Sequence, residues 1–235
     1  MERGRILQLQ KDYSAALVAF DDALRLRPQD ARVSRFRAET LLELNRLPEA
    51  LQSLDDCLKF GPADAGTFRA RAALRTRLGQ YAGAQADYTH ALEQQPNPAT
   101  YAARGWCFLV SDAPRLALPD FEESLRRDPA QSDAYAGRGF CRVLAGEISP
   151  AITDAEEALR LGPESPRLYY NVARIYAQGV VALNRSSSSS RANAGVLNVR
   201  SCQERAVQTL AQALPCRLLR KRHASGKTLW NPTRV

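Results

Sequence analysis

A proline recurs along most of the chain at successive intervals of 34, 34, 33 and 34 residues. These prolines are Pro28, Pro62, Pro96, Pro129 and Pro163. Small residues keep the same step at Gly4, Ala38, Ala72, Gly105, Gly139 and Ala173, and a larger series follows at Phe20, Leu54, Tyr88 and Phe121. A fixed period of this length indicates a solenoid in which each unit buries its apolar face against its neighbours.

The third unit, residues 65–97, shows what is repeated. Apolar and small residues fall at helical spacing before and after Gly79, which interrupts the pattern. The unit is therefore predicted to be a helix, a short turn and a second helix. Small residues at Ala72 and Ala84 let the two helices approach closely, and Tyr88 fills the space beside them.

The order of small residue, aromatic, alanine, aromatic, alanine and proline resembles the tetratricopeptide repeat. The resemblance implies an all-α fold, an α-solenoid that winds as a right-handed superhelix of about six helix-turn-helix hairpins. Residues 1–214 are expected to form the array, with units at 1–30, 31–64, 65–97, 98–131, 132–165 and 166–214.

The two ends of the array depart from the family pattern. Met1 falls inside the expected first helix, so the first unit is predicted to be truncated. Residues 215–235 are too short and too basic for the capping helix usual in such arrays, and we expect a disordered tail. The sequence thus favours a piece or isoform of a longer array, or ends that bind something, including a second copy.

Two local features are open to alternative interpretations. The sixth unit carries a flexible serine-rich insert at about residues 180–199, in which Ser186–Ser190 is either a tolerated loop or a phosphorylation switch. Pro119 lies about one turn into the second helix of the fourth unit. That helix either starts late or is kinked there.

The basic character of the chain is confined to its last part. The net charge is +8 and the pI is near 9.5, but residues 185–235 carry +9 and the remainder −1. Nucleic acid or an anionic surface is therefore a candidate partner of the tail only. Five unpaired cysteines indicate a reducing compartment, and the sequence shows no apolar stretch long enough to span a bilayer, so we expect a cytoplasmic or nuclear protein without membrane attachment.

Catalytic chemistry is not indicated. The two histidines, His90 and His223, lack Cys, Asp or Glu at metal-ligand spacing, and no phosphate-binding loop or nucleophile motif is present. Acidic pairs such as Asp55–Asp56 recur with the repeat, which favours a solvated face over a catalytic dyad. We expect a protein that is not an enzyme and that binds no metal or cofactor.

Four arginines occupy one position in successive units, immediately before the small residue: Arg37, Arg71, Arg104 and Arg138. We call this series the arginine ladder. It either binds an anion or pairs with acids of the second helices such as Asp87, Asp120 and Asp154, and the close helix contact beside it favours the pairing.

Proteins of the tetratricopeptide family bind partners on a concave groove lined by the first helices. Helical phase assigns to it Arg35, Arg69, Arg77, Trp106, Leu109, Phe140, Val143, Tyr170 and Arg174. An exposed Trp106 beside Phe140 would anchor a peptide or helix whose acidic flanks meet the arginines. The alternative, held equally open, is that both rings pack between helices.

We therefore expect a non-enzymatic scaffold that binds another protein. The clamp for chaperone C-terminal carboxylates is not expected, because in no register do the required lysines and asparagines appear; one register holds Arg35, Glu39, Ala70, Ala99 and Ala103. Alternatives are a nucleic-acid-associated protein that uses the basic tail and a non-catalytic subunit of an enzyme complex. Thr233 and Val235 also resemble a PDZ-domain ligand.

Overall fold

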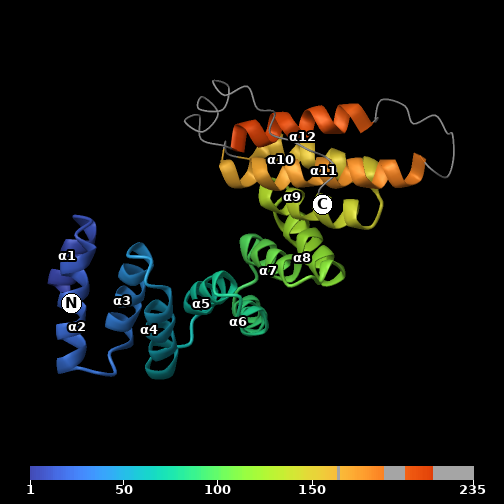
Figure 1. The fold of residues 1–235 in the computed structure, drawn as a ribbon. Coiled ribbons are helices and arrows are strands. Elements are labelled where there is room, and N and C mark those ends of the chain that lie inside the picture. Colours follow the sequence, from blue (N-terminus) through green and yellow to red (C-terminus); the bar gives the residue numbers. More distant parts are fainter. Residues whose placement is uncertain (163–164, 188–198, 214–235) are drawn as a thin grey trace, which may run out of the picture. The chain divides into compact units, whose positions relative to one another are not determined.

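The computed structural model describes residues 1–162, 165–187 and 199–213 (Figure 1). These residues form twelve α-helices and contain no strand. The helices are α1 (Glu2–Leu9), α2 (Tyr13–Leu26), α3 (Ala31–Glu43), α4 (Leu47–Phe60), α5 (Ala65–Arg77), α6 (Tyr81–Gln94), α7 (Pro98–Val110), α8 (Pro114–Arg127), α9 (Ser132–Leu144), α10 (Ile148–Leu161), α11 (Pro166–Ser187) and α12 (Val199–Ala213).

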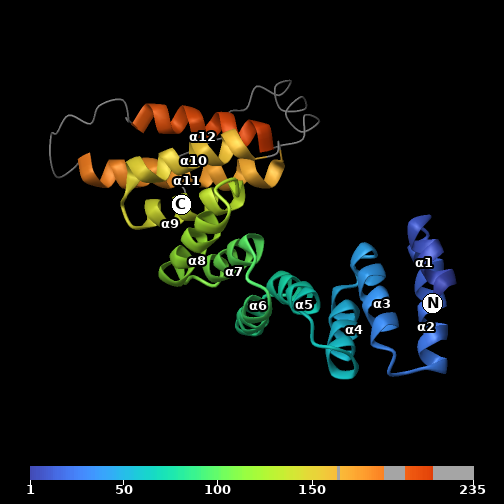
Figure 2. The same cartoon turned by 180° about the vertical axis from the view of Figure 1, so that it is seen from behind.

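Each odd-numbered helix packs against the even-numbered helix that follows it, so the described helices form six hairpins (Figures 1 and 2). The predicted all-α solenoid of helix-turn-helix units is confirmed. The first helix, α1, has 8 residues, whereas α3, α5, α7 and α9 each have 13. The chain divides into two compact units, unit 1 at Met1–Arg127 and unit 2 at Asp128–Val235, which are described separately.

The turn inside each of the first five hairpins contains one residue in the left-handed backbone region. These residues are Lys11, Asn45, Gly79, Asp112 and Gly146, with φ between 55° and 86°. Each first helix ends in the same way: in the third hairpin, for example, the Gln80 amide donates to the Arg75 carbonyl at 2.8 Å. This helix end is a Schellman motif, which reverses the chain and satisfies carbonyls that the helix leaves unpaired.

The small residues in the first helices allow aromatic rings to pack against the backbone, as the sequence predicts. A Cβ atom added to Gly4 would lie 2.6 Å from the Phe20 ring, and one added to Gly105 would lie 2.9 Å from the Phe121 ring. In the second hairpin the smaller pair Ala38 and Leu54 belongs to the buried core. Glycine in the first and fourth hairpins thus leaves room for a phenylalanine ring, and alanine in the second hairpin packs with the smaller leucine.

Three members of the arginine ladder form buried ion pairs inside their hairpins, which confirms the structural interpretation for them, whereas Arg37 pairs with Asp21 of the preceding hairpin at 2.7 Å. Arg71 donates two hydrogen bonds to the Asp87 carboxylate, at 2.8 and 2.6 Å, and Asp87 is only 2% exposed. The pairs Arg104–Asp120 and Arg138–Asp154 repeat this two-bond geometry. Arg71 also donates to Asp55 of the preceding hairpin, at 2.8 Å. One guanidinium therefore links two consecutive hairpins.

Two local expectations need correction. The second helix of the fourth hairpin does not start late, because α8 begins at Pro114 and contains Pro119. The serine-rich insert does not begin at residue 180, because α11 continues to Ser187. The rest of that insert, the basic tail and the PDZ-like terminus at Thr233 and Val235 lie outside the described residues, so their roles remain predictions.

Removing the carboxylate of Asp87 should destabilise unit 1 strongly. The Asp87→Ala substitution would leave Arg71 and Arg75, which both donate to this carboxylate, without their shared buried partner. Loss of one partner of a buried ion pair costs about 3–5 kcal/mol. Glu39→Ala is the matched control, because the Arg35–Glu39 pair is half-exposed, and it should change stability by less than about 0.5 kcal/mol. Urea unfolding followed by circular dichroism measures both, and equal effects would contradict the buried role.

The match between Gly105 and Phe121 predicts a non-additive pair of substitutions. Gly105→Ala alone should cost about 1–3 kcal/mol, because the added methyl group would overlap the Phe121 ring. Combining it with Phe121→Leu recreates the Ala–Leu pair of the second hairpin and should relieve that overlap. A double-mutant cycle on unfolding free energies is expected to give a favourable coupling of about 1 kcal/mol, and strictly additive effects would refute the size-matching argument.

Candidate functional site

The residues predicted to line the groove fall in both units. Arg35, Arg69, Arg77, Trp106 and Leu109 belong to unit 1, and Phe140, Val143, Tyr170 and Arg174 belong to unit 2. The structure brings side chains together within each unit, and each set is considered by itself.

In unit 1 the three predicted arginines are exposed on α3 and α5. Arg35 donates to Glu39 at 3.4 Å along the surface of α3, and Arg77 donates to Asn45 at 3.3 Å. Arg69 forms no ion pair with any other residue that the structure describes. We call this surface, defined by Arg35, Glu39, Arg69 and Arg77, the first-helix face. It carries a net positive charge.

The first-helix face contains a small pocket between α3 and α5, with a volume of about 60 Å³. It is lined by Arg35, Ala38, Glu39, Leu42, Leu54, Gly66, Thr67 and Ala70. Ala38 and Leu54 are buried at its base, whereas Arg35 and Glu39 are exposed. Sequence reasoning missed this pocket. Its only signal was the run of small residues, Gly66 and Ala70, one turn apart on α5.

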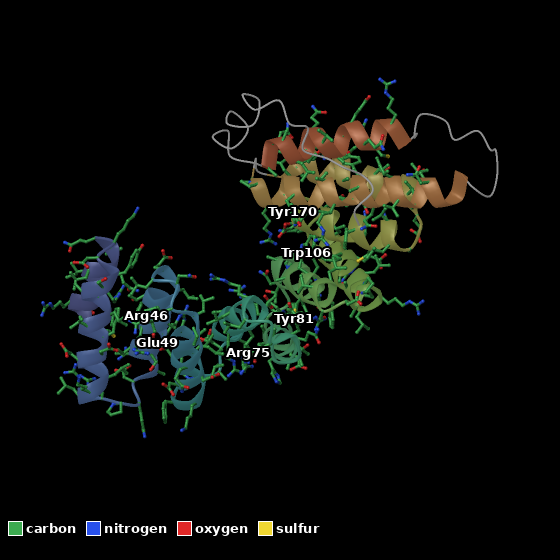
Figure 3. The ribbon with its side chains drawn as sticks, viewed as in Figure 1. Arg46, Glu49, Arg75, Tyr81, Trp106 and Tyr170 are labelled. Carbon is green, nitrogen blue, oxygen red and sulfur yellow. The ribbon has the colours of Figure 1, made fainter. Side chains whose placement is uncertain are left out.

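Trp106 and Leu109 are half-buried on α7, and Figure 3 shows the position of Trp106. The Trp106 ring meets Phe121 of α8 edge to face, with centroids 5.6 Å apart. Trp106 is therefore partly a packing residue of its own hairpin, with part of its surface exposed. The neighbouring Val110 is 51% exposed and adds apolar surface at the end of α7.

In unit 2 the prediction that Phe140 and Val143 line an exposed groove is wrong. Phe140 is 7% exposed and Val143 4%, so the packing alternative holds for Phe140. The Arg174 guanidinium lies over the Phe140 ring at 4.2 Å and also approaches the Tyr170 ring at 5.9 Å. Tyr170 is 53% exposed on α11 (Figure 3). Of the four residues of unit 2 that were predicted to line the groove, Tyr170 is exposed and Arg174 is half-buried.

Among the described residues, the titratable groups with a shifted pKa include buried thiols and one ion-paired carboxylate. No group of three or more His, Cys, Asp or Glu side chains that could hold a metal occurs there. Burial raises the pKa of the Cys57, Cys107 and Cys202 thiols, which opposes the thiolate form that nucleophilic chemistry needs. Hydrogen bonds from Arg126 and Arg127 lower the pKa of Glu123 to about 2, so this half-buried carboxylate stays ionised at neutral pH.

Across the part of the chain that the structure describes, no helix is both long and apolar enough to cross a membrane.

Because Phe140 is buried and Tyr170 is exposed, we expect truncation of the two rings to change the unfolding free energy by different amounts. Both rings contact Arg174, but only Phe140 is buried. Phe140→Ala should lower the unfolding free energy by about 3–5 kcal/mol, whereas Tyr170→Ala should change it by less than about 1 kcal/mol. Hydrogen exchange of the α9 and α11 amides measures the loss in unit 2. Similar protection in the two variants would show that Phe140 is not a core residue.

Comparisons with known proteins bear on the fold. Residues 1–65 match the sequence profile of the family described as tetratricopeptide repeat. No curated protein sequence matches the chain. Among solved structures, MamA has a TM-score of 0.65 at 16% identity and covers 68% of this chain and 94% of its own.

Two further structures extend the likeness. The C-terminal part of a repeat-containing protein from Cytophaga hutchinsonii has a TM-score of 0.67 at 17% identity, with 89% of this chain and 79% of its own covered. YrrB, described as a TPR protein with an unusual peptide-binding site, has a TM-score of 0.54 at 19% identity, with 88% and 98% covered. At these identities the likeness concerns the fold. Residues 1–65 thus match the tetratricopeptide repeat profile, and the described residues of the chain have the fold of tetratricopeptide repeat proteins.

Proposed function

We propose that the chain is a non-enzymatic scaffold that binds an extended peptide of another protein on the first-helix face of unit 1. The pocket between α3 and α5 is the observation that carries this proposal, because it opens on that face between two consecutive first helices. One water occupies about 30 Å³ of liquid volume. A pocket of about 60 Å³ therefore accommodates a small apolar side chain such as alanine or valine.

The charges around the pocket determine the preferred flanks of the peptide. Arg35, Arg69 and Arg77 outnumber the single acid of the face, Glu39, and all four side chains are exposed. Acidic residues on both sides of the small apolar residue would pair with these arginines. Such charge complementarity raises the association rate and fixes the register of the peptide more than it raises the affinity. Arg69 is the strongest candidate for a direct contact, because it makes no ion pair among the described residues.

The remaining accessible residues extend the proposed surface within each unit. In unit 1, Trp106, Leu109 and Val110 add an apolar segment on α7, where an aromatic ring with one packed edge makes a rigid anchor. In unit 2, Tyr170 and Arg174 offer a separate aromatic and cationic contact. The described peptide-binding site of YrrB, a protein of the same fold, supports a peptide as the class of partner.

Filling the pocket should abolish peptide binding without unfolding the array. Random-peptide selection on the wild-type protein is expected to yield sequences with a small apolar residue flanked by Asp or Glu. Ala70→Leu places three extra carbons in the pocket and should weaken the selected peptides at least about tenfold, or about 1.4 kcal/mol. The measurement is isothermal titration calorimetry, with thermal melting to confirm folding.

The control is Ala86→Leu, which adds the same atoms at an exposed position of α6 outside the pocket. It should bind the selected peptides as the wild type does. If Ala70→Leu binds them equally well, the pocket is not the binding site and the proposed function fails in this form.

A further inference from the structure

Unit 1 has a second and larger concavity on the edge where consecutive hairpins are joined. It is an open hollow of about 660 Å³. Its lining comes from the connection between α2 and α3 and from the end of α4: Arg27, Pro28, Gln29, Asp30, Ala31, Arg32, Phe60, Gly61 and Pro62. We call it the junction hollow. It shares no lining residue with the pocket on the first-helix face.

The next junction shows why this hollow is open. Gln94 occupies the position in α6 that Phe60 occupies in α4, and its side-chain amide donates to the Ala63 carbonyl at 2.8 Å. This hydrogen bond joins the end of α6 to the connection between α4 and α5. Phe60 has no donor with which to make the equivalent bond to Gln29. Its ring therefore remains partly exposed, at 36%.

The base of the hollow is apolar and closely packed. A Cβ atom added to Gly61 would lie 2.4 Å from the Ala31 Cβ, so the start of α3 and the end of α4 touch directly at this point. Pro28, Pro62 and the Phe60 ring surround this contact. Together they offer a preformed apolar surface that needs little rearrangement to receive a side chain.

The rim of the hollow carries uncompensated positive charge. The Arg27 and Arg32 side chains are 79% and 75% exposed, and each lies 3.9 Å from the single acid, Asp30. The Asp30 side chain is the N-cap of α3, because it accepts hydrogen bonds from the Arg32 and Val33 amides at 3.1 and 3.3 Å. The Lys59 ammonium lies 5.0 Å from the centre of the Phe60 ring. Two exposed arginines thus share one carboxylate that already accepts hydrogen bonds, and a third cation lies over the Phe60 ring.

We propose that the junction hollow is a second binding site, for an acidic peptide segment that carries a large apolar side chain. The apolar side chain would pack against Phe60, Pro28 and Pro62, and the flanking carboxylates would pair with Arg27 and Arg32. A peptide fits better than nucleic acid, because Lys59 occupies one face of the only aromatic ring in the lining and the chain outside its last part carries a net charge of −1.

The test uses fluorescein-labelled hexapeptides of sequence Asp-Glu-X-X-Glu-Asp, in which X is Trp, Phe or Leu, and fluorescence polarisation on the full chain. Phe60→Gln should weaken binding at least about tenfold, because it imitates Gln94 and closes the hollow. Arg27→Gln with Arg32→Gln should weaken binding at least about fivefold and reduce its salt dependence. Melting temperatures establish that both variants fold.

Two controls separate this site from the rest of the molecule. Arg25→Gln with Arg126→Gln removes the same charge from exposed positions outside the hollow and should leave the affinity within about twofold. Ala70→Leu, which fills the pocket on the first-helix face, should also leave it unchanged. A loss with Ala70→Leu but not with Phe60→Gln would assign these peptides to the first-helix face and overturn the second site.

Two other outcomes also overturn the proposal. In one, none of the hexapeptides binds up to roughly millimolar concentration. In the other, a thymidine dodecanucleotide displaces the bound peptide and itself loses affinity in Phe60→Gln, which would identify the hollow as a nucleic-acid contact.

Discussion

The buried ion pair between a first-helix arginine and a second-helix aspartate is the interaction on which the arrangement of the hairpins depends. In the third hairpin Asp87 receives Arg71 and Arg75 from one helix, while Arg71 also reaches Asp55 of the hairpin before it. Such a pair adds little net stability compared with apolar packing, but it penalises any arrangement that separates its members. The ladder therefore sets the register of helix on helix and of hairpin on hairpin.

This division of roles leaves the exposed side of the first helices free to vary. Contacts that hold the hairpins together use the ladder and the small residues beside it, such as Ala72, which is fully buried. The exposed positions on the same helices can then change without loss of the fold, and they do so within this chain. Arg35 and Arg69 lie on the polar side of unit 1, whereas Val110 makes the end of α7 apolar.

The sequence was sufficient for the features that depend on one residue type recurring at one position. The period, the hairpins and the pairing of the ladder follow from that recurrence. The left-handed turn residues keep the same step but escaped notice, because lysine, asparagine, glycine and aspartate alternate there and only the backbone angle is shared. The burial of Phe140 could not be predicted for a different reason. Its position on the helix directs it toward the groove, but the Arg174 guanidinium, from a residue 34 positions further along the chain, covers its ring.

The concavities do not follow from the recurring residues, because each arises from a difference between neighbouring repeats. The pocket between α3 and α5 exists because Gly66 and Ala70 leave space that larger residues would fill. The junction hollow exists because phenylalanine stands where the next repeat has a glutamine that bonds across the junction. In a repeat array the recurring residues specify the fold, and a residue that breaks the recurrence at a surface is under no such structural demand. Departures from the repeat that create space or leave charge unpaired are therefore the positions at which binding specificity is most readily encoded.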